Sequence, residues 1–362
     1  MRYLFGFLSV CALGVMPVVG CGDTNVTVYC GTDGTAGSGG FEGSGGSGGV
    51  VGDAFPCTEQ GIVDAIAEGG GPHTFACGGP TTVTTEAEIV IDNDVILNGE
   101  GNLTVAGDRD HRVFWVLEGA TAELSGLTVT EGVSEEGSGI WNQGSLSLTS
   151  VTVSDNASQA PGGGIRNEGT LMLTNSTVSG NSSLFTGGGI HNDNSGIMTA
   201  TNSTISGNAG VAANGISNQG MLTLTNSTLS GESTNVCCAG GGLEPEGASL
   251  TISGTVIRGF CDDEVLPTLQ PNGYNIESPG DTCSFDQQGD QPSVTEMQLN
   301  LGELADNGGL TMTHKPGAGG FGEGSAAIDQ IPEADCGVTA DQRGEPRPGG
   351  AMCDVGSVEV QP

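Results

Sequence analysis

Three observations predict an all-β parallel solenoid. The phrase GGGIRNEGTLMLTNSTVSGN at residues 162–181 returns in similar form at intervals of about 25 residues. Each copy is rich in Thr, Ser, Asn and Gly, and its apolar residues alternate instead of recurring at helical spacing. Aromatic residues make up only 4% of the chain, which favours many thin core layers over one thick core. About seven coils of about 25 residues fit between residues 85 and 265.

Equivalent aliphatic residues form three columns through the predicted coils. Because the coils of a parallel β-helix stack about 4.8 Å apart, equivalent residues lie above one another and fill the interior. The first column is Ile140, Ile165, Ile190, Ile216 and Leu243. The second is Leu148, Leu173, Ala200, Leu224 and Ile252, and the third is Val153, Val178, Ile205, Leu229 and Ile257.

Asparagine recurs at two further positions of the repeat, where stacked side-chain amides can bond along the solenoid. The two predicted ladders are Asn142, Asn167, Asn192 and Asn218, and Asn156, Asn181 and Asn208. The triplet NST begins at Asn175, Asn202 and Asn226 and matches the glycosylation sequon. We interpret these three asparagines as ladder positions instead.

A short helix is predicted before the first strands, over residues 58–69. Thr58 is a suitable N-cap, and Gly69 is a suitable end. Ile62, Val63, Ile66 and Ala67 are expected to form its apolar face.

The N-terminus predicts export and lipid anchoring. Arg2 precedes an apolar run that ends in small residues before Cys21, as in a bacterial lipoprotein signal. We therefore expect a signal peptide over residues 1–20, with lipid attached to Cys21 at the outer membrane or cell surface. Residues 21–55 are rich in Gly and Ser and predict a flexible tether. Residues 56–289 would form the β-helix, and residues 290–362 would cap its open strand edges.

The charge balance restricts the partners. With 8 Lys+Arg against 43 Asp+Glu, the net charge is -35, which argues against nucleic acid and anionic membrane surfaces. Contact with the membrane is expected only through the N-terminal lipid, and carbohydrate or another cell-surface component remains as the partner.

Six cysteines of the expected folded region fall in local pairs. An exported protein meets oxidising conditions, so structural disulfides are expected. The predicted pairs are Cys57–Cys77, Cys261–Cys283 and Cys336–Cys353, which leaves Cys30, Cys237 and Cys238 unassigned.

Several phrases of the sequence resemble those of a known protein family. They are the repeated NSTISGN, LADNGGLTMTHKPGAGGFGEGSAAIDQ at 304–330 and DQRGEPRPGGAMCDVGSVE at 341–359. Together with CTEQGIVDAIAEGGGPHTFACGGP near residue 57, they resemble bacterial exported proteins of the choice-of-anchor Q type, within the pectin-lyase-like superfamily. The resemblance covers residues 57–360. It implies a right-handed single-stranded parallel β-helix, a capping role for the N-terminal helix, and a surface-exposed location.

One outward column is the candidate site. If Ile165 points inward, Arg166 and Glu168 point outward, as do His191 and Asp193 in the next coil. Trp141 precedes Arg166 in the same column, so Trp141, Arg166 and His191 could line a carbohydrate groove. Arg166, Glu168, His191 and Asp193 are the catalytic candidates, because paired carboxylates suit a retaining glycosidase or a calcium site. The alternative is that these residues form solvated cross-strand pairs on the surface without a role in binding or catalysis.

A second cluster lies at Asp108, Asp110 and His111, where the choice is between a metal or acid–base site and a charged turn. We expect no cofactor, with calcium as the alternative at Asp108 and Asp110. His73 and His314 are interpreted as structural.

The function predicted is a binding or structural module on the cell surface. The alternative is a polysaccharide lyase or glycoside hydrolase. The scarcity of basic residues argues against an enzyme of this kind that acts on acidic polysaccharides.

Overall fold

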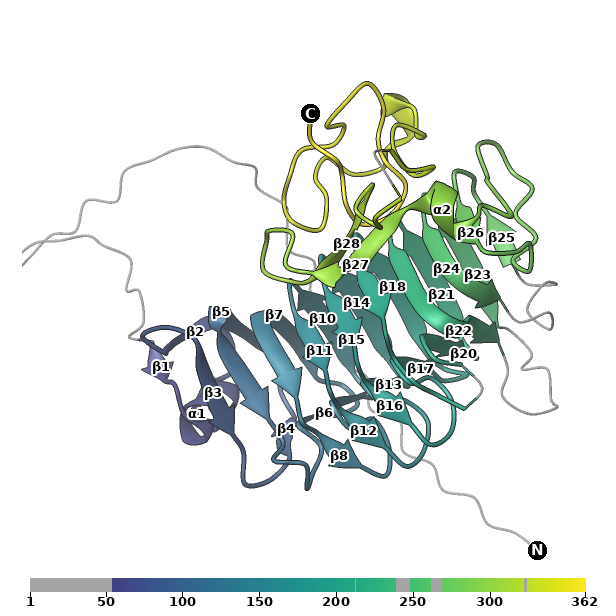
Figure 1. Cartoon of the computed structure of the whole chain (residues 1–362). Helices are drawn as coiled ribbons and strands as arrows, with labels where there is room; N and C mark the ends of the chain where they lie inside the picture. Colours follow the sequence, from purple (N-terminus) through teal and green to yellow (C-terminus); the bar gives the residue numbers. More distant parts are fainter. Residues whose placement is uncertain (1–53, 212, 239–247, 262–268, 322–323) are drawn as a thin grey trace, which may run out of the picture. The chain divides into compact units, whose positions relative to one another are not determined.

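The computed structural model describes residues 54–211, 213–238, 248–261, 269–321 and 324–362 (Figure 1). Cys21, Cys30, the expected signal peptide and nearly all of the expected tether lie outside these residues. Within them, mostly parallel strands stack as a solenoid of about seven turns, accompanied by two α-helices. The predicted all-β parallel solenoid is therefore confirmed.

Each coil contributes short strands to three faces, which we call sheets 1, 2 and 3. Sheet 1 contains β4 (Ile89–Ile91), β6 (Phe114–Val116), β9 (Ile140–Asn142), β13 (Ile165–Asn167), β17 (Ile190–Asn192), β20 (Ile216–Asn218) and the end of β22 (Thr228–Cys238). Sheet 2 contains β2 (Gly70–Ala76), the first halves of β5 (Val95–Ala106) and β7 (Thr121–Thr130), β10 (Ser145–Thr149), β14 (Thr170–Thr174), β18 (Ile197–Thr201), β21 (Met221–Thr225), β23 (Ser249–Ser253) and β25 (Leu269–Pro271).

Sheet 3 contains β3 (Thr81–Thr84), the second halves of β5 and β7, β11 (Thr152–Ser154), β15 (Thr177–Ser179), β19 (Thr204–Ser206), the start of β22, β24 (Val256–Cys261) and β26 (Ile276–Ser278). Three short strands, β8 (Val133–Ser134), β12 (Ala157–Ser158) and β16 (Ser182–Ser183), pair separately. At the start of the described chain, β1 (Phe55–Pro56) pairs with β2.

The aliphatic columns fill the interior as predicted. Ile140, Ile165, Ile190 and Ile216 are each 0% exposed and stand in register across sheet 1. The expected continuation of this column at Leu243 is wrong. The register places Val236 opposite Ile216, while Leu243 lies outside the described residues. The spacing on sheet 1 is therefore 20 residues at this step, while the spacing on sheet 2, from Met221 to Ser249, is 28 residues.

Both asparagine ladders form inside the solenoid. Asn142 donates from Nδ2 to Oδ1 of Asn167 at 2.7 Å, and the same bond joins Asn167 to Asn192 at 2.7 Å. In the second ladder, Asn156 bonds Asn181 at 2.9 Å. The amides bond one another along the core, and Oδ1 of Asn142, at the first position of its ladder, is the ladder atom left without a partner among the described residues.

The NST asparagines are not ladder residues, which corrects that interpretation. Asn175, Asn202 and Asn226 turn the chain between sheets 2 and 3 with φ of 52°, 48° and 46°. Asparagine tolerates this left-handed conformation better than most residues, which explains the repeated choice. Asn202 and Asn226 also donate side-chain hydrogen bonds to the carbonyl oxygens of Ala340 and Cys336.

The N-terminal helix α1 runs over Glu59–Glu68. Its predicted caps are confirmed: the Thr58 hydroxyl accepts from the amide of Gly61 at 3.1 Å, and Gly69 ends the helix with φ of 69°. The predicted apolar face needs correction. Ile62 and Ile66 are buried, but Val63 is 40% exposed. Ala67 is exposed as well, and Gly61 and Ala65 complete the buried face.

All three predicted disulfides form: Cys57–Cys77, Cys261–Cys283 and Cys336–Cys353. The first joins the segment before α1 to the end of β2. The second joins β24 to the loop after β26. The third lies within the C-terminal segment.

The C-terminal segment contains α2 (Glu296–Leu299), the hairpin of β27 (Leu301–Ala305) and β28 (Thr313–Pro316), and the 3-10 helix η2 (Glu333–Asp335). It differs from the end cap that we expected, because it lies across the side of several coils (Figure 1). The hydroxyl of Thr177 donates to the carbonyl of Met312, and that of Thr204 donates to Oε1 of Gln342. This contact buries Thr177, Thr204 and Thr228 on the outward side of sheet 3.

A buried ionic network holds the last 20 or so residues together. Asp341 accepts backbone N–H bonds from Arg343 at 2.8 Å and Glu359 at 2.9 Å, and its carboxylate pairs with Nη2 of Arg343 at 2.7 Å. The side chain of Arg347 is 0% exposed and donates to the carbonyl of Asp354 at 3.0 Å. Burial raises the pKa of Asp354 to about 6. The phrase DQRGEPRPGGAMCDVGSVE therefore has a structural role.

No helix in the described part of the chain is both long and apolar enough to cross a membrane.

Candidate functional site

The outward column of sheet 1 holds the residues that the sequence singled out. Trp141 stands in register with Arg166, and Arg166 stands in register with His191. Their neighbours Ile165 and Ile190 are fully buried, so the three side chains project away from the core. The predicted stacking along this face is confirmed, while the catalytic and binding roles of these residues stay predictions.

Carboxylates enclose the guanidinium of Arg166. Its Nη1 lies 2.6 Å from Oε2 of Glu136, its Nε lies 2.9 Å from Oε1 of Glu168, and its Nη2 lies 3.0 Å from Oδ2 of Asp193. The Arg166 side chain is only 17% exposed. Glu136, Glu168 and Asp193 therefore share one cation, and the carboxylates outnumber it.

His191 is closed off from solvent, with an exposed fraction of 3%. Burial lowers its pKa to about 4, although Asp193, 3.8 Å from Nε2, acts in the opposite direction. The imidazole is neutral at pH 7, and its Nδ1 is a buried atom without a hydrogen-bond partner. General acid–base catalysis needs a group that exchanges protons with substrate near the working pH. His191 does not meet that requirement in this arrangement.

The cluster includes two residues that the sequence analysis did not assign. The Trp115 ring stacks on Trp141 with centroids 5.1 Å apart and an interplanar angle of 6°. The guanidinium of Arg112 lies 4.7 Å from the centroid of the Trp141 ring and pairs with Glu88. Trp115 precedes Trp141 by one repeat and stands in register with it, so the repeat spacing of the two tryptophans indicates this stack. Stacked rings and paired cations make this face a stabilising array.

The loop with Asp108 and Asp110 is a charged turn. Asp108 and Arg109 adopt φ of 52° and 60°, and Arg109 pairs with Glu131 at 3.1 Å. His111 bonds from Nε2 to the hydroxyl of Thr85 at 2.7 Å. Among the described residues, no group of three or more His, Cys, Asp or Glu side chains is placed to hold a metal ion.

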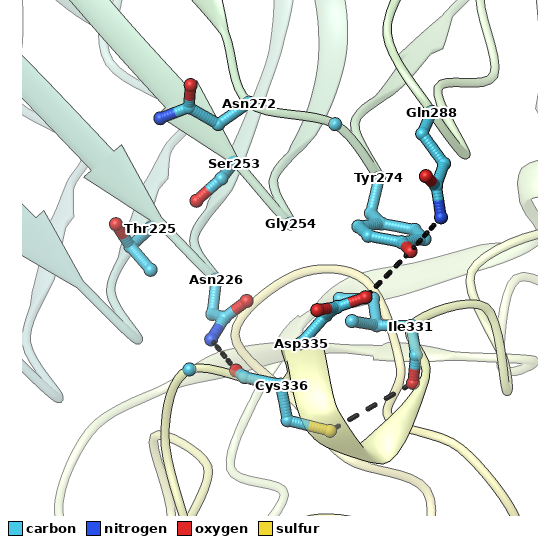
Figure 2. A pocket seen from close by; sticks show the side chains of 12 residues that line it. Thr225, Asn226, Ser253, Gly254, Asn272, Tyr274, Gln288, Ile331, Asp335 and Cys336 are labelled. Carbon is cyan, nitrogen blue, oxygen red and sulfur yellow. Dashed lines mark hydrogen bonds between the residues drawn. The ribbon is translucent and has the colours of Figure 1, made fainter.

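A pocket of ≈ 350 Å³ lies where sheet 2 meets the C-terminal segment (Figure 2). Thr225 and Ser253 come from the ends of β21 and β23, and Asn272 and Tyr274 come from the loop between β25 and β26. Asp335, on η2, forms part of the opposite wall. This volume falls within the usual range of small-ligand sites.

The Tyr274 ring is held in place from several sides. Its hydroxyl donates to Oδ2 of Asp335 at 2.9 Å and accepts from Nε2 of Gln288 at 2.8 Å (Figure 2). The ring lies against the backbone of Gly289, where an added Cβ would come within 2.2 Å of the ring. Tyr274 itself has φ of 59°, an uncommon conformation for an aromatic residue. A fixed ring beside amides, hydroxyls and a carboxylate can stack on one face of a ligand and bond its polar edge.

Sequence patterns gave no indication of this pocket. Its residues come from five separate stretches of the chain, and two of these, at Gln288 and at residues 331–337, lie after the last strand of the solenoid. Their spacing carries meaning only after the C-terminal segment has packed against the coils.

The scan against protein-family models, the search of curated proteins and the search of solved structures each found no match to this chain.

Proposed function

We propose that this chain is an exported, lipid-anchored surface protein whose solenoid binds carbohydrate without cleaving it. Arg2, the apolar run and Cys21 support export and anchoring, and the Gly/Ser-rich tether would hold the folded part away from the membrane. The resemblance to choice-of-anchor Q type proteins, in the right-handed pectin-lyase-like superfamily, supports a surface location.

The pocket beside Tyr274 is the observation that carries the binding role. The ring offers an apolar face for the C–H groups of a sugar, while Asn272, Thr225 and Ser253 offer donors and acceptors for its hydroxyls. Asp335 adds a carboxylate that accepts hydrogen bonds from hydroxyl groups. A pocket with this composition favours a neutral sugar, because the chain carries a net charge of -35.

The state of the Arg166 cluster supports binding over catalysis. Its carboxylates Glu136, Glu168 and Asp193 all pair with Arg166, and His191 is buried with a pKa of about 4. A lyase or glycosidase acting on this face would need at least one of these groups free to meet substrate.

The test is binding of the full chain to a panel of neutral and acidic glycans, with and without Ca²⁺. We expect affinity for at least one neutral glycan, with no product released. Tyr274→Ala should weaken that affinity at least tenfold, whereas Phe185→Ala, which changes an aromatic side chain that is 63% exposed elsewhere, should not.

Two outcomes would reject the proposal. One is the absence of binding to every glycan, and the other is unchanged binding by Tyr274→Ala. The anchor is tested separately, since Cys21→Ser should release the protein from the membrane fraction. Retention of that variant in the membrane would contradict lipid anchoring.

A further inference from the structure

A second hollow, a groove of ≈ 1020 Å³, shares no lining residue with the Tyr274 pocket. Its floor is the outward side of sheet 3, where Ser179, Ser206 and Ser230 stand in register on successive strands. One wall is the hairpin of β27 and β28, which contributes Met312 and His314. The groove therefore exists only where the C-terminal segment lies on the coils.

Ser206 and His314 meet in this groove. The Oγ of Ser206 lies 2.7 Å from Nε2 of His314, and Nδ1 of His314 lies 2.6 Å from the carbonyl oxygen of Gly302. Both side chains are more than nine-tenths buried, with exposed fractions of 6% and 3%. The imidazole is thus fixed between a hydroxyl on β19 and a carbonyl on β27.

The hydrogen-bond partners determine the tautomer of His314. The Gly302 carbonyl can only accept, so Nδ1 carries the proton and donates to it. In the neutral ring, Nε2 is then an acceptor, and the Ser206 hydroxyl must donate to it. The result is a serine whose proton points at a base, with the base oriented by a third group, which is the arrangement of an activated nucleophile.

The surroundings keep this histidine neutral. Burial lowers the pKa of His314 below its usual value, and the positive charge of Arg258 adds to the lowering. The Gly302 carbonyl and the carboxylate of Glu303 act in the opposite direction. Arg258, which pairs with Glu296 at 2.8 Å, also lines the groove, as do the carboxylates of Asp155 and Glu303.

We propose that this groove is an ester-hydrolysing site in which Ser206 is the nucleophile and His314 is the general base. The Oγ of Ser206 attacks the carbonyl carbon of a carboxylic ester while its proton moves to Nε2 of His314. The C–O bond to the alcohol then breaks, and the departing alcohol takes the proton from Nε2. Water attacks the acyl-serine, Nε2 accepts its proton and returns it to Oγ, and a carboxylic acid leaves. The Gly302 carbonyl acts as the positioning group.

The lining indicates the kind of ester. Phe260, Leu304 and Met312 offer an apolar surface for a short acyl group, beside a row of serine hydroxyls suited to a polar alcohol. The strongly acidic chain disfavours a charged alcohol part. Short-chain esters of uncharged, hydroxyl-rich alcohols fit this chemistry. This inference does not depend on the Tyr274 pocket, and it concerns a different bond from the glycosidic linkage considered above.

The experiment uses the purified full chain with p-nitrophenyl acetate and with an O-acetylated neutral polysaccharide. A fluorophosphonate probe, followed by peptide mass spectrometry, reports the nucleophile directly. We expect turnover above the buffer rate and labelling of Ser206. Ser206→Ala and His314→Gln should each lower the rate at least 100-fold. The rate of the wild type should fall as pH drops and Nε2 of His314 becomes protonated.

Ser217→Ala is the matched control, because Ser217 is also a buried serine of the solenoid but stands on sheet 1, in register with His191 and outside the groove. It should retain both labelling and turnover. Thermal unfolding of every variant separates loss of the nucleophile from loss of the fold. The proposal is overturned if the folded wild type is neither labelled nor active, or if Ser217→Ala loses as much activity as Ser206→Ala. In either case the Ser206–His314 bond only attaches the C-terminal segment.

Discussion

Two buried histidines make the stability of the fold depend on pH. His191 and His314 are each 3% exposed, and burial lowers the pKa of both. A histidine whose pKa is lower in the folded state than in the unfolded state binds protons more readily after unfolding. Its contribution to stability is therefore complete above pH about 6.5 and is lost as pH falls.

For His191 this argument gives a measurable loss of stability in acid. The folded pKa is about 4, so the loss extends between pH about 6.5 and about 4. From pH 7.5 to 4.5, the wild type should lose about 2 kcal/mol more free energy of unfolding than His191→Gln, as measured by urea titration. Equal pH dependence of the two proteins would show that His191 is not buried as described.

At the scale of elements, one glutamine attaches the C-terminal segment to the solenoid. Nε2 of Gln342 donates to the hydroxyls of Thr177 and Thr311 at 2.9 Å each, and Oε1 accepts from the hydroxyl of Thr204 at 2.6 Å. Gln342 is 3% exposed, so these bonds form away from water. Removing the amide would break three buried hydrogen bonds at once and leave a cavity, although each hydroxyl keeps a second partner.

Gln342→Ala should therefore cost about 2–3 kcal/mol and loosen the segment. Limited proteolysis should cleave within residues 290–362 faster than in the wild type, before the coils are attacked. Gln361→Ala is the control, since Gln361 is exposed and donates one hydrogen bond, to the carbonyl of Pro346. If the two variants were cleaved at the same rate, Gln342 would not hold the segment.

For the whole molecule, charge is the dominant property. The chain carries 43 Asp+Glu and 8 Lys+Arg, and the carboxylates that meet few cations repel one another in the folded state. Local pairing relieves only part of this repulsion, as around Arg166 and in the network of Asp341, Arg343 and Glu359.

Added salt should consequently stabilise the protein. Raising NaCl from about 0.01 M to about 0.3 M shortens the Debye length several-fold and should raise the unfolding temperature by a few degrees. KCl at the same ionic strength should act equally, which distinguishes screening from binding of a particular ion. A lower unfolding temperature in salt would mean that ion pairs contribute more than repulsion.

The repeat made the solenoid predictable. Residues such as Ile165 and Asn167 recur in every well-formed copy, and stacking requires equivalent positions to meet. Prediction failed where the spacing of the repeat becomes irregular. The column after Ile216 continues at Val236, only 20 residues later, whereas the next step on sheets 2 and 3 takes 28 residues, from Met221 to Ser249 and from Thr228 to Val256. The position of the C-terminal segment was not predictable, since nothing periodic connects Gln342 with Thr204.

The candidate site was predictable in its register but not in its charge balance. Sequence alternation placed Arg166 above Trp141, as observed. It could not show that Glu136, from a loop, would complete the enclosure of Arg166, or that His191 would be buried. Long-range contacts decide the pKa of such groups, and local sequence does not contain them.

The C-terminal segment also limits how this protein can change in length. It bonds to Thr177, Thr204 and Thr228, which belong to three consecutive coils. Duplication or deletion of one coil within this region would displace its partners by about 4.8 Å, and the bonds could not all form. Coils before Thr177 escape most of this constraint. We therefore expect natural variation in coil number to occur in the N-terminal half of the solenoid, with the later coils kept at a constant count.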